Sequence, residues 1–318
     1  MIRIALLIIF TIMTLDVYGW ETHKDLTKLT LQMQENWNKP AYEPIENILS
    51  SLSIDSKPSP TSLQQLIEQL EIQGDKVNWQ WQPVSTPEKP ITALDILLYS
   101  SDEPDQGMDQ NLRLADYQDK MGGYVGMSSQ GIRHMYFPDW TFSAPLATFH
   151  IPFHAMGFAP ARAQLFFDLA IQLRNNVHSF WSYRFLGWGI HYLQDLCQPY
   201  HASQFGSFWL LPYSKLIPWN WGKFVTEATR RVSNFHLSYE QYTQYLLLND
   251  PDGPSNVGRS FVTPDASEEL VLILKDPAVT ADNAAITLDL SSARLASKAV
   301  ASQNNLMGDL LFDSQMDI

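Results

Sequence analysis

The residues best suited to chemistry lie in one short segment, between positions 189 and 201. His191 and Asp195 are four residues apart, a spacing that puts both side chains on one face of a helix. The surrounding sequence is apolar, and a buried carboxylate is costly unless it is paired or binds a metal ion. Pro199 ends the helix and lets His201 turn back toward the same space. Because zinc prefers histidine and carboxylate ligands, this segment predicts a zinc site.

A second histidine–carboxylate pair repeats the spacing farther along the chain. His236 and Glu240 are also four residues apart. One such pair by itself is commonly a local hydrogen bond within a helix. Two pairs, together with His201 beyond a helix-ending proline, favour metal binding over that structural alternative.

These two segments resemble motifs of a known enzyme family. Residues 191–201 are similar to the HxxxDxxxxxH core of the zinc-dependent phospholipase C and P1-type nuclease superfamily, and residues 236–240 to its later HxxxE element. The resemblance implies an all-helical protein that holds three zinc ions in a cleft. It also implies a mature chain that begins with a tryptophan whose α-amino group binds zinc. Trp20 matches that residue, and His23 matches the histidine that shares its zinc.

Two further ligands of the family precede the core helices. Glu103-Pro104-Asp105 resembles the segment with the first of them, and His134, at the head of an aromatic-rich stretch, resembles the second. Asp102 and Asp109 stay open as alternatives to Asp105, because the gap to His134 is longer than usual in the family. The resemblance implies one zinc held by Asp105, His134, His191 and Asp195, a second held by Trp20, His23 and a bridging Asp195, and a third held by His201, His236 and Glu240.

The resemblance implies hydrolysis of phosphodiester bonds, with Asp105 as a general base beside its role as a ligand. Glu240 stands where the nuclease relatives usually have Asp, which favours the phospholipase C branch and the glycerol-side phosphodiester of lipids such as phosphatidylcholine. The aromatic-rich residues 205–224 lie between two ligand-bearing segments, where they either meet a lipid interface or pack as a lid or core. The candidate substrate-binding residues in this segment are Trp209, Tyr213, Trp219 and Trp221.

Two other functions stay open. A P1-type single-strand nuclease would stack bases on the same aromatic residues. A zinc-stabilised secreted binding protein would use the metal for folding alone. The chain has 34 acidic and 21 basic residues and a net charge of −13, which argues against a nucleic-acid partner. A phospholipid or membrane surface is the expected partner, and we expect a monomer.

The N-terminal residues have the pattern of a signal peptide. Arg3 precedes an uncharged apolar run of 12 residues, from 4 to 15, which is too short to span a membrane. Val17 and Gly19 are small residues at the −3 and −1 positions of a cleavage site. We therefore expect residues 1–19 to be removed and the chain to be secreted or periplasmic. Cys197 is the only cysteine, which excludes an internal disulfide and a cysteine-based zinc site.

The remaining sequence must supply the elements that position these groups. Apolar periodicity predicts helices around residues 23–33, at 62–71, from Pro160 onward and at 177–197, with others near 225–248, 267–274 and 282–302. Residues 100–160 have the composition of a long, functional loop. No segment shows sustained two-residue alternation with hairpin turns. The sequence thus predicts an all-α fold, with residues 20–318 forming one domain.

Overall fold

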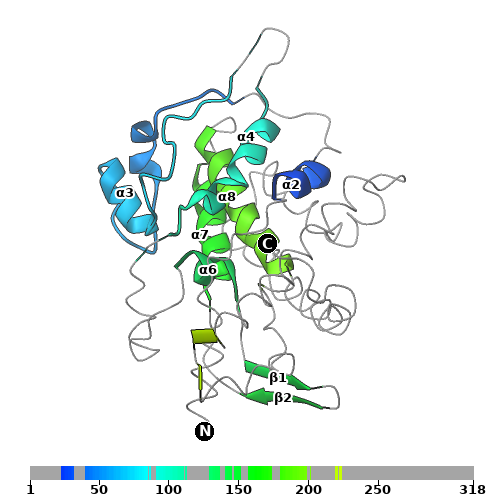
Figure 1. Cartoon of the computed structure of the whole chain (residues 1–318). Coiled ribbons are helices and arrows are strands. Elements are labelled where there is room, and N and C mark those ends of the chain that lie inside the picture. Colours follow the sequence, from blue (N-terminus) through cyan, green and yellow to red (C-terminus); the bar gives the residue numbers. More distant parts are fainter. Residues whose placement is uncertain are drawn as a thin grey trace.

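The computed structural model describes residues 23–31, 40–84, 86, 91–110, 112, 129–136, 140–144, 147–151, 157–173, 180–198, 201, 219–220 and 222–223 (Figure 1). These residues are mainly helical. The α-helices are α2 (His23–Leu31), α3 (Leu63–Leu70), α4 (Ala93–Ser100), α6 (Ser129–His134), α7 (Ala159–Gln172) and α8 (Phe180–Cys197). Short 3-10 helices are η1 (Ile45–Asn47), η2 (Leu49–Ser51) and η3 (Glu103–Gln106).

Helix α8 is the central element of the described fold. It packs against α7 and α4 and also contacts α2, α6 and η3. Its sequence is apolar nearly all round, and Trp181, Phe185 and Trp188 are fully buried. Two glycines allow the close approach of its neighbours: a Cβ at Gly187 would lie 2.5 Å from the Cβ of Ser100 in α4, and one at Gly189 would lie 2.7 Å from Phe167 in α7.

The helix ends follow signals in the sequence. Ser62 caps α3 by accepting a hydrogen bond from the backbone N–H of Gln65, at 3.2 Å. Thr92 and Asp95 form a reciprocal capping box at the start of α4. Proline lies in the first turn of α7, where its missing N–H has no intrahelical partner to lose. The helices predicted at 62–71, from Pro160 and at 177–197 are therefore confirmed to within a few residues.

The segment predicted as a long loop is more ordered than its composition indicates. It contains η3, α6 and an antiparallel hairpin of β1 (Trp140–Ala144) and β2 (Ala147–Ile151). The pairing runs from Trp140 opposite Ile151 to Ala144 opposite Ala147. Both strands are rich in aromatic and β-branched residues, which favour extended backbone, but each has only five residues. A pattern this short gives little alternation to detect, so the sequence reading missed the hairpin.

Several predictions fall outside the described residues. These are the signal peptide at 1–19, the helices predicted after residue 225, and the candidate site residues Trp20, Trp209, Tyr213, Trp221, His236 and Glu240. Within the described part of the chain, no helix has both the length and the apolar character needed to cross a membrane.

Candidate metal centre

The structure brings six of the predicted ligands together in one place. They come from α2, η3, α6, α8 and a position four residues beyond the α8 end, and we call them the His/Asp cluster: His23, Asp105, His134, His191, Asp195 and His201. All are buried except Asp105, whose side chain is 19% exposed. The cluster therefore joins parts of the sequence that lie more than 170 positions apart.

Four donor atoms form the more compact half of the cluster. His134 Nδ1 lies 3.0 Å from Asp195 Oδ2, 3.0 Å from His191 Nε2 and 3.3 Å from Asp105 Oδ1. His191 Nε2 lies 3.3 Å from Asp195 Oδ2 and 3.6 Å from Asp105 Oδ1. Ligands at about 2.0–2.1 Å from a tetrahedral zinc lie roughly 3.3–3.4 Å from one another. These distances are compatible with ligands of one ion, and the trio His134, His191 and Asp195 could hold a metal ion, as could the trio His23, Asp105 and His191.

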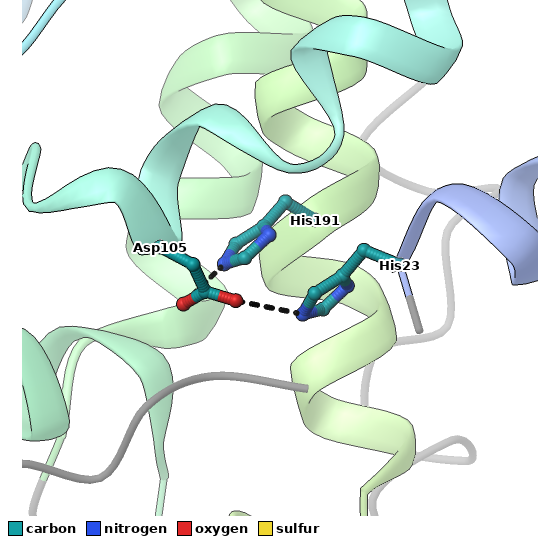
Figure 2. A group of neighbouring side chains, drawn as sticks. All are labelled: His23, Asp105 and His191. Carbon is teal, nitrogen blue, oxygen red and sulfur yellow. Dashed lines mark ion pairs between the residues drawn. The ribbon is translucent and has the colours of Figure 1, made fainter. Parts of the chain in front are cut away.

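The other oxygens of the two carboxylates face different imidazoles. Asp105 Oδ2 lies 3.6 Å from His23 Nε2. Asp195 Oδ1 lies 3.6 Å from the same His23 nitrogen and 2.9 Å from His201 Nδ1. Figure 2 shows Asp105 between His23 and His191, with ion pairs to both rings. Both oxygens of each carboxylate thus face imidazole nitrogens.

In three of the histidine rings, the second ring nitrogen, on the side away from the cluster, lies next to an oxygen atom. The His191 Nδ1–H donates to the carbonyl oxygen of Ser101 at 2.7 Å, and the His23 Nδ1–H donates to Gln194 Oε1 at 2.8 Å. Asp109 Oδ2 lies 3.4 Å from His134 Nε2. Metal-binding histidines commonly donate their second ring N–H in this way, which fixes the tautomer and the ring orientation. The Nε2 atoms of His23 and His191 therefore face the carboxylates.

The ionisation of the cluster suits a cation. Burial by itself would lower the pKa of His134, but the carboxylates of Asp195 and Asp109 outweigh it and raise the pKa to about 10. Burial lowers the pKa of His191 well below 6.5, and the nearby His23 lowers it further. Burial favours a neutral Asp195, yet the surrounding imidazoles hold the pKa of its carboxyl well below the usual range. A metal ion would replace the proton on His134 and keep the Asp195 charge compensated.

The structure also separates the three candidate aspartates near position 105. Asp102 Oδ1 accepts a hydrogen bond from the backbone N–H of Lys24 at 3.1 Å, in the first turn of α2. Asp109 accepts hydrogen bonds from two arginines and a tyrosine. Of the three, Asp105 is the one whose two oxygens both face imidazole nitrogens of the cluster. The geometry therefore favours Asp105 over both alternatives.

The predicted aromatic rim is described at one position. Trp219 is 88% exposed, next to the exposed Asn220. Its exposure differs from that of Trp181 and Trp188, which are fully buried in the core. Trp219 is therefore available for contact with a surface outside the chain.

The sequence reading missed the residues that support the ligands. They are Ser101, Gln194 and Asp109, which accept from ligand rings, and Glu103, Gln130 and Arg184, which hold the segment around Asp105. The role of Arg184 could have been predicted from the sequence, because an arginine within an otherwise apolar helix requires a buried acceptor. The role of the Ser101 carbonyl oxygen could not have been predicted, because every residue supplies a backbone oxygen.

The helical fold and the His/Asp cluster are the features with which other proteins can be compared. No protein-family model, curated protein or solved structure matches this chain. The functional conclusion therefore depends on the chemistry of the cluster and on the sequence motifs. What the geometry supports directly is a buried set of histidines and aspartates that could hold a metal ion.

Proposed function

We propose that this protein is a secreted zinc-dependent hydrolase of phosphodiester bonds, a phospholipase C that acts on lipids such as phosphatidylcholine. The observation that carries the proposal is the placement of Asp105 and Asp195, each with one oxygen toward His191 and the other toward His23. A carboxylate placed between two imidazoles can bind two closely spaced cations. Phosphodiester hydrolysis commonly uses such a pair of cations. The motif resemblance of residues 191–201 and 236–240 adds independent support.

The proposal assigns the ligands to three ions. Asp105, His134, His191 and Asp195 would hold the first, which the short distances of His134 and His191 from both carboxylates support. The resemblance adds Trp20 to His23 and Asp195 at the second ion, and gives His201, His236 and Glu240 to the third. When bound, paired zinc ions stabilise the charge on the attacking and leaving oxygens of an in-line displacement.

Asp105 is the residue of the cluster that solvent reaches. Its side chain is 19% exposed, whereas His23, His134, His191 and Asp195 are fully buried. Water and substrate therefore approach the cluster from the Asp105 side. A carboxylate oxygen in this position can accept the proton that an attacking water loses, which supports Asp105 as the general base. His23 and His191 keep their orientation through Gln194 and Ser101 during that transfer.

Two observations favour lipid over nucleic acid as substrate. The chain has a net charge of −13, which opposes the approach of a polyanion beyond the local charge of the metal ions. Trp219 is 88% exposed, and tryptophan prefers the interface between a membrane and water. The exposed Trp219 suits contact with a lipid surface, whereas the negative net charge provides no long-range attraction to DNA.

The experiment compares two substrates with protein that begins at Trp20. Zinc is removed with a chelator and restored, and the release of phosphocholine from phosphatidylcholine vesicles is measured beside cleavage of single-stranded DNA. The proposal predicts zinc-dependent phosphocholine release and no DNA cleavage. DNA cleavage without lipid hydrolysis would instead support the P1-type nuclease. Zinc binding without either activity would support a non-catalytic binding protein.

A variant tests the role of Asp105 in the same assay. Asp105→Asn should lower turnover by about 100-fold or more, because it removes both a ligand charge and the general base. Asp102→Asn is the matched control, since Asp102 contacts the α2 backbone instead of the cluster. Equal activity of the two variants would contradict the assignment of Asp105.

A further inference from the structure

A second buried charge pair lies between η3 and α8. The Glu103 carboxylate accepts hydrogen bonds from Arg184 Nε at 2.8 Å, from Arg184 Nη2, and from Trp188 Nε1 at 2.8 Å. Arg184 Nη2 also donates to the carbonyl oxygen of Asn78 at 2.9 Å. Arg184 and Trp188 are fully buried, and Glu103 is nearly so. Since a buried ion pair adds little stability over a well-packed apolar pair, it needs another explanation than stability.

The position of this pair along α8 suggests its role. Arg184, Trp188, His191 and Asp195 follow one another at intervals of four, three and four residues. This spacing places them along one face of the helix. Glu103 begins η3, and Asp105 follows two residues later. The same helix face thus holds one end of η3 and, one to two turns later, supplies His191, which faces Asp105, and Asp195.

The other end of this segment is held by α6. Gln130 Nε2 donates to the carbonyl oxygen of Pro104 at 2.9 Å, and Gln130 Oε1 accepts from the backbone N–H of Asp109 at 3.2 Å. Gln130 Nε2 also lies 3.0 Å from His134 Nε2, one helical turn away on α6. The residues on both sides of Asp105 are therefore tied to the helices that carry its partners.

We infer that Glu103 is a positioning residue for Asp105: its bonds to Arg184 and Trp188 set the place of η3 on α8, so that both Asp105 oxygens face the imidazoles. The inference rests on the metal site proposed above. A 3-10 helix of four residues has little stability of its own, and Gly107, with a φ of 96°, ends it directly. Without the Glu103 anchor, η3 would lose its hydrogen bonds to α8.

Two tryptophans of α8 provide a matched pair of variants. Trp188 Nε1 donates to Glu103 Oε2 at 2.8 Å, and Trp181 Nε1 donates to the carbonyl oxygen of Glu43, also at 2.8 Å. Both residues are fully buried. Trp188→Phe and Trp181→Phe each remove a buried indole N–H and similar volume from the same helix. Only the first removes a hydrogen-bond donor to Glu103, and a phenylalanine at 181 keeps an aromatic ring over Arg184.

The experiment measures metal binding and thermal unfolding for the full mature protein and both variants. Zinc dissociation constants are determined by competition with a chromophoric chelator, and the Co²⁺-substituted proteins are compared by absorption spectroscopy. We expect Trp188→Phe to weaken zinc binding about 10-fold or more, as is typical when an outer partner of a ligand is lost. Its Co²⁺ spectrum should change. Trp181→Phe should keep the wild-type affinity and spectrum even if its unfolding temperature falls equally.

The outcomes distinguish this inference from the proposed function. If Trp188→Phe and Trp181→Phe bind zinc alike and share the wild-type Co²⁺ spectrum, Glu103 has no positioning role, while the metal site stands. If the wild-type protein binds neither ion, the proposed function itself fails. Should Trp188→Phe not fold, Glu103→Asp replaces it, since this change keeps the charge and withdraws the carboxylate by one methylene. An unchanged Co²⁺ spectrum for folded Glu103→Asp would likewise overturn the inference.

Discussion

Asp109 and Asp195 are both fully buried and lie on opposite sides of the same imidazole. Asp109 Oδ2 is 3.4 Å from His134 Nε2, and Asp195 Oδ2 is 3.0 Å from His134 Nδ1. Their other partners differ. Asp109 accepts hydrogen bonds from Arg133 and Arg162, at 3.2 Å each, and from the hydroxyl of Tyr192. The described partners of Asp195 are instead imidazole nitrogens.

The difference shows that two buried aspartates in the same core can have different roles, which depend on the type of cation around each. Guanidinium groups stay charged at any ordinary pH, so Arg162 and Arg133, with His134, overcome the effect of burial and hold the pKa of Asp109 far below its usual range. The charge of Asp109 is therefore compensated without a metal. Imidazoles can lose their protons, so the surroundings of Asp195 can exchange a proton for a metal ion. Asp109 stabilises the fold and orients His134, whereas Asp195 belongs to the proposed metal site.

Removal of the Asp195 charge should have the largest effect. Asp195→Asn takes a bridging oxygen ligand from both halves of the cluster, and we expect zinc binding at this pair of sites to be lost. The metal-free variant should lose less stability than Asp109→Asn, because the imidazoles around Asp195 can release their protons whereas the arginines around Asp109 cannot. Isothermal titration with zinc and thermal unfolding in chelator measure the two quantities. Retained binding at wild-type affinity would remove Asp195 from the site.

The corresponding change at Asp109 should act mainly on stability. Asp109→Asn leaves Arg133 and Arg162 buried with less negative charge nearby, and we expect the free energy of unfolding to fall by about 3–5 kcal/mol. Zinc affinity should fall by about 10–100-fold, since the His134 ring loses its carboxylate acceptor. Denaturant unfolding in chelator isolates the stability effect. If Asp109→Asn and Asp195→Asn have the same profile, the distinction between the two carboxylates is wrong.

Metal binding should depend on pH through His134. Its pKa is raised from 6.5 to about 10 in the metal-free protein, so the ring carries a proton at pH 7. Zinc must displace that proton, and the affinity should rise about 10-fold per pH unit between pH 6 and 9. Calorimetry in buffers of different ionisation enthalpy should detect at least one proton released at pH 7.5, because Asp195 also raises the pKa of His23 against the effect of burial. Zinc binding without proton release would contradict the charged state of His134.

The pH dependence of stability should have opposite signs in the metal-free and the zinc-bound protein. In the metal-free protein, protonated His134 stabilises the fold fully below pH 6.5, and the contribution is lost as the pH rises toward about 10. With zinc bound, stability should instead increase over the same range, because deprotonation favours the ligand form. Unfolding curves with and without chelator at several pH values would check the two opposite slopes.

The smallest effect is expected at Asp102. Asp102→Ala removes the acceptor for the Lys24 N–H in the first turn of α2 and should lower the free energy of unfolding by about 1 kcal/mol. Zinc affinity should change less than threefold, because Asp102 does not face the ligand nitrogens described above. The same titration and unfolding assays apply. A large loss of zinc affinity would indicate that Asp102, and not Asp105, contributes the ligand.

Local patterns in the sequence predicted many of the described helices and the placement of His191 and Asp195 on one helix face. Helix periodicity located α3, α7 and α8, because each has a regular apolar pattern and a recognisable end signal. The spacing of His191 and Asp195 fixed their common face, and the structure places their side-chain atoms 3.3 Å apart. The hairpin at residues 140–151 escaped prediction because its strands are too short for a clear two-residue pattern.

Tertiary structure decided the rest of the centre. The sequence predicts Asp105 and leaves Asp102 and Asp109 open as alternatives, since spacing along a loop does not determine which side chain faces a distant helix. Only the packing of η3 on α8, with Glu103 bound to Arg184 and Trp188, turns Asp105 toward the imidazoles.

The sequence by itself therefore determined the ligand chemistry and the helix that presents it, because residue type and periodicity are local properties. The folded structure decided which carboxylate joins the histidines and which one faces arginines, because that choice depends on contacts between residues far apart in the chain. Asp109 and Asp195 show the result. Both are buried aspartates, and only their three-dimensional partners distinguish a structural charge from one placed to bind a cation.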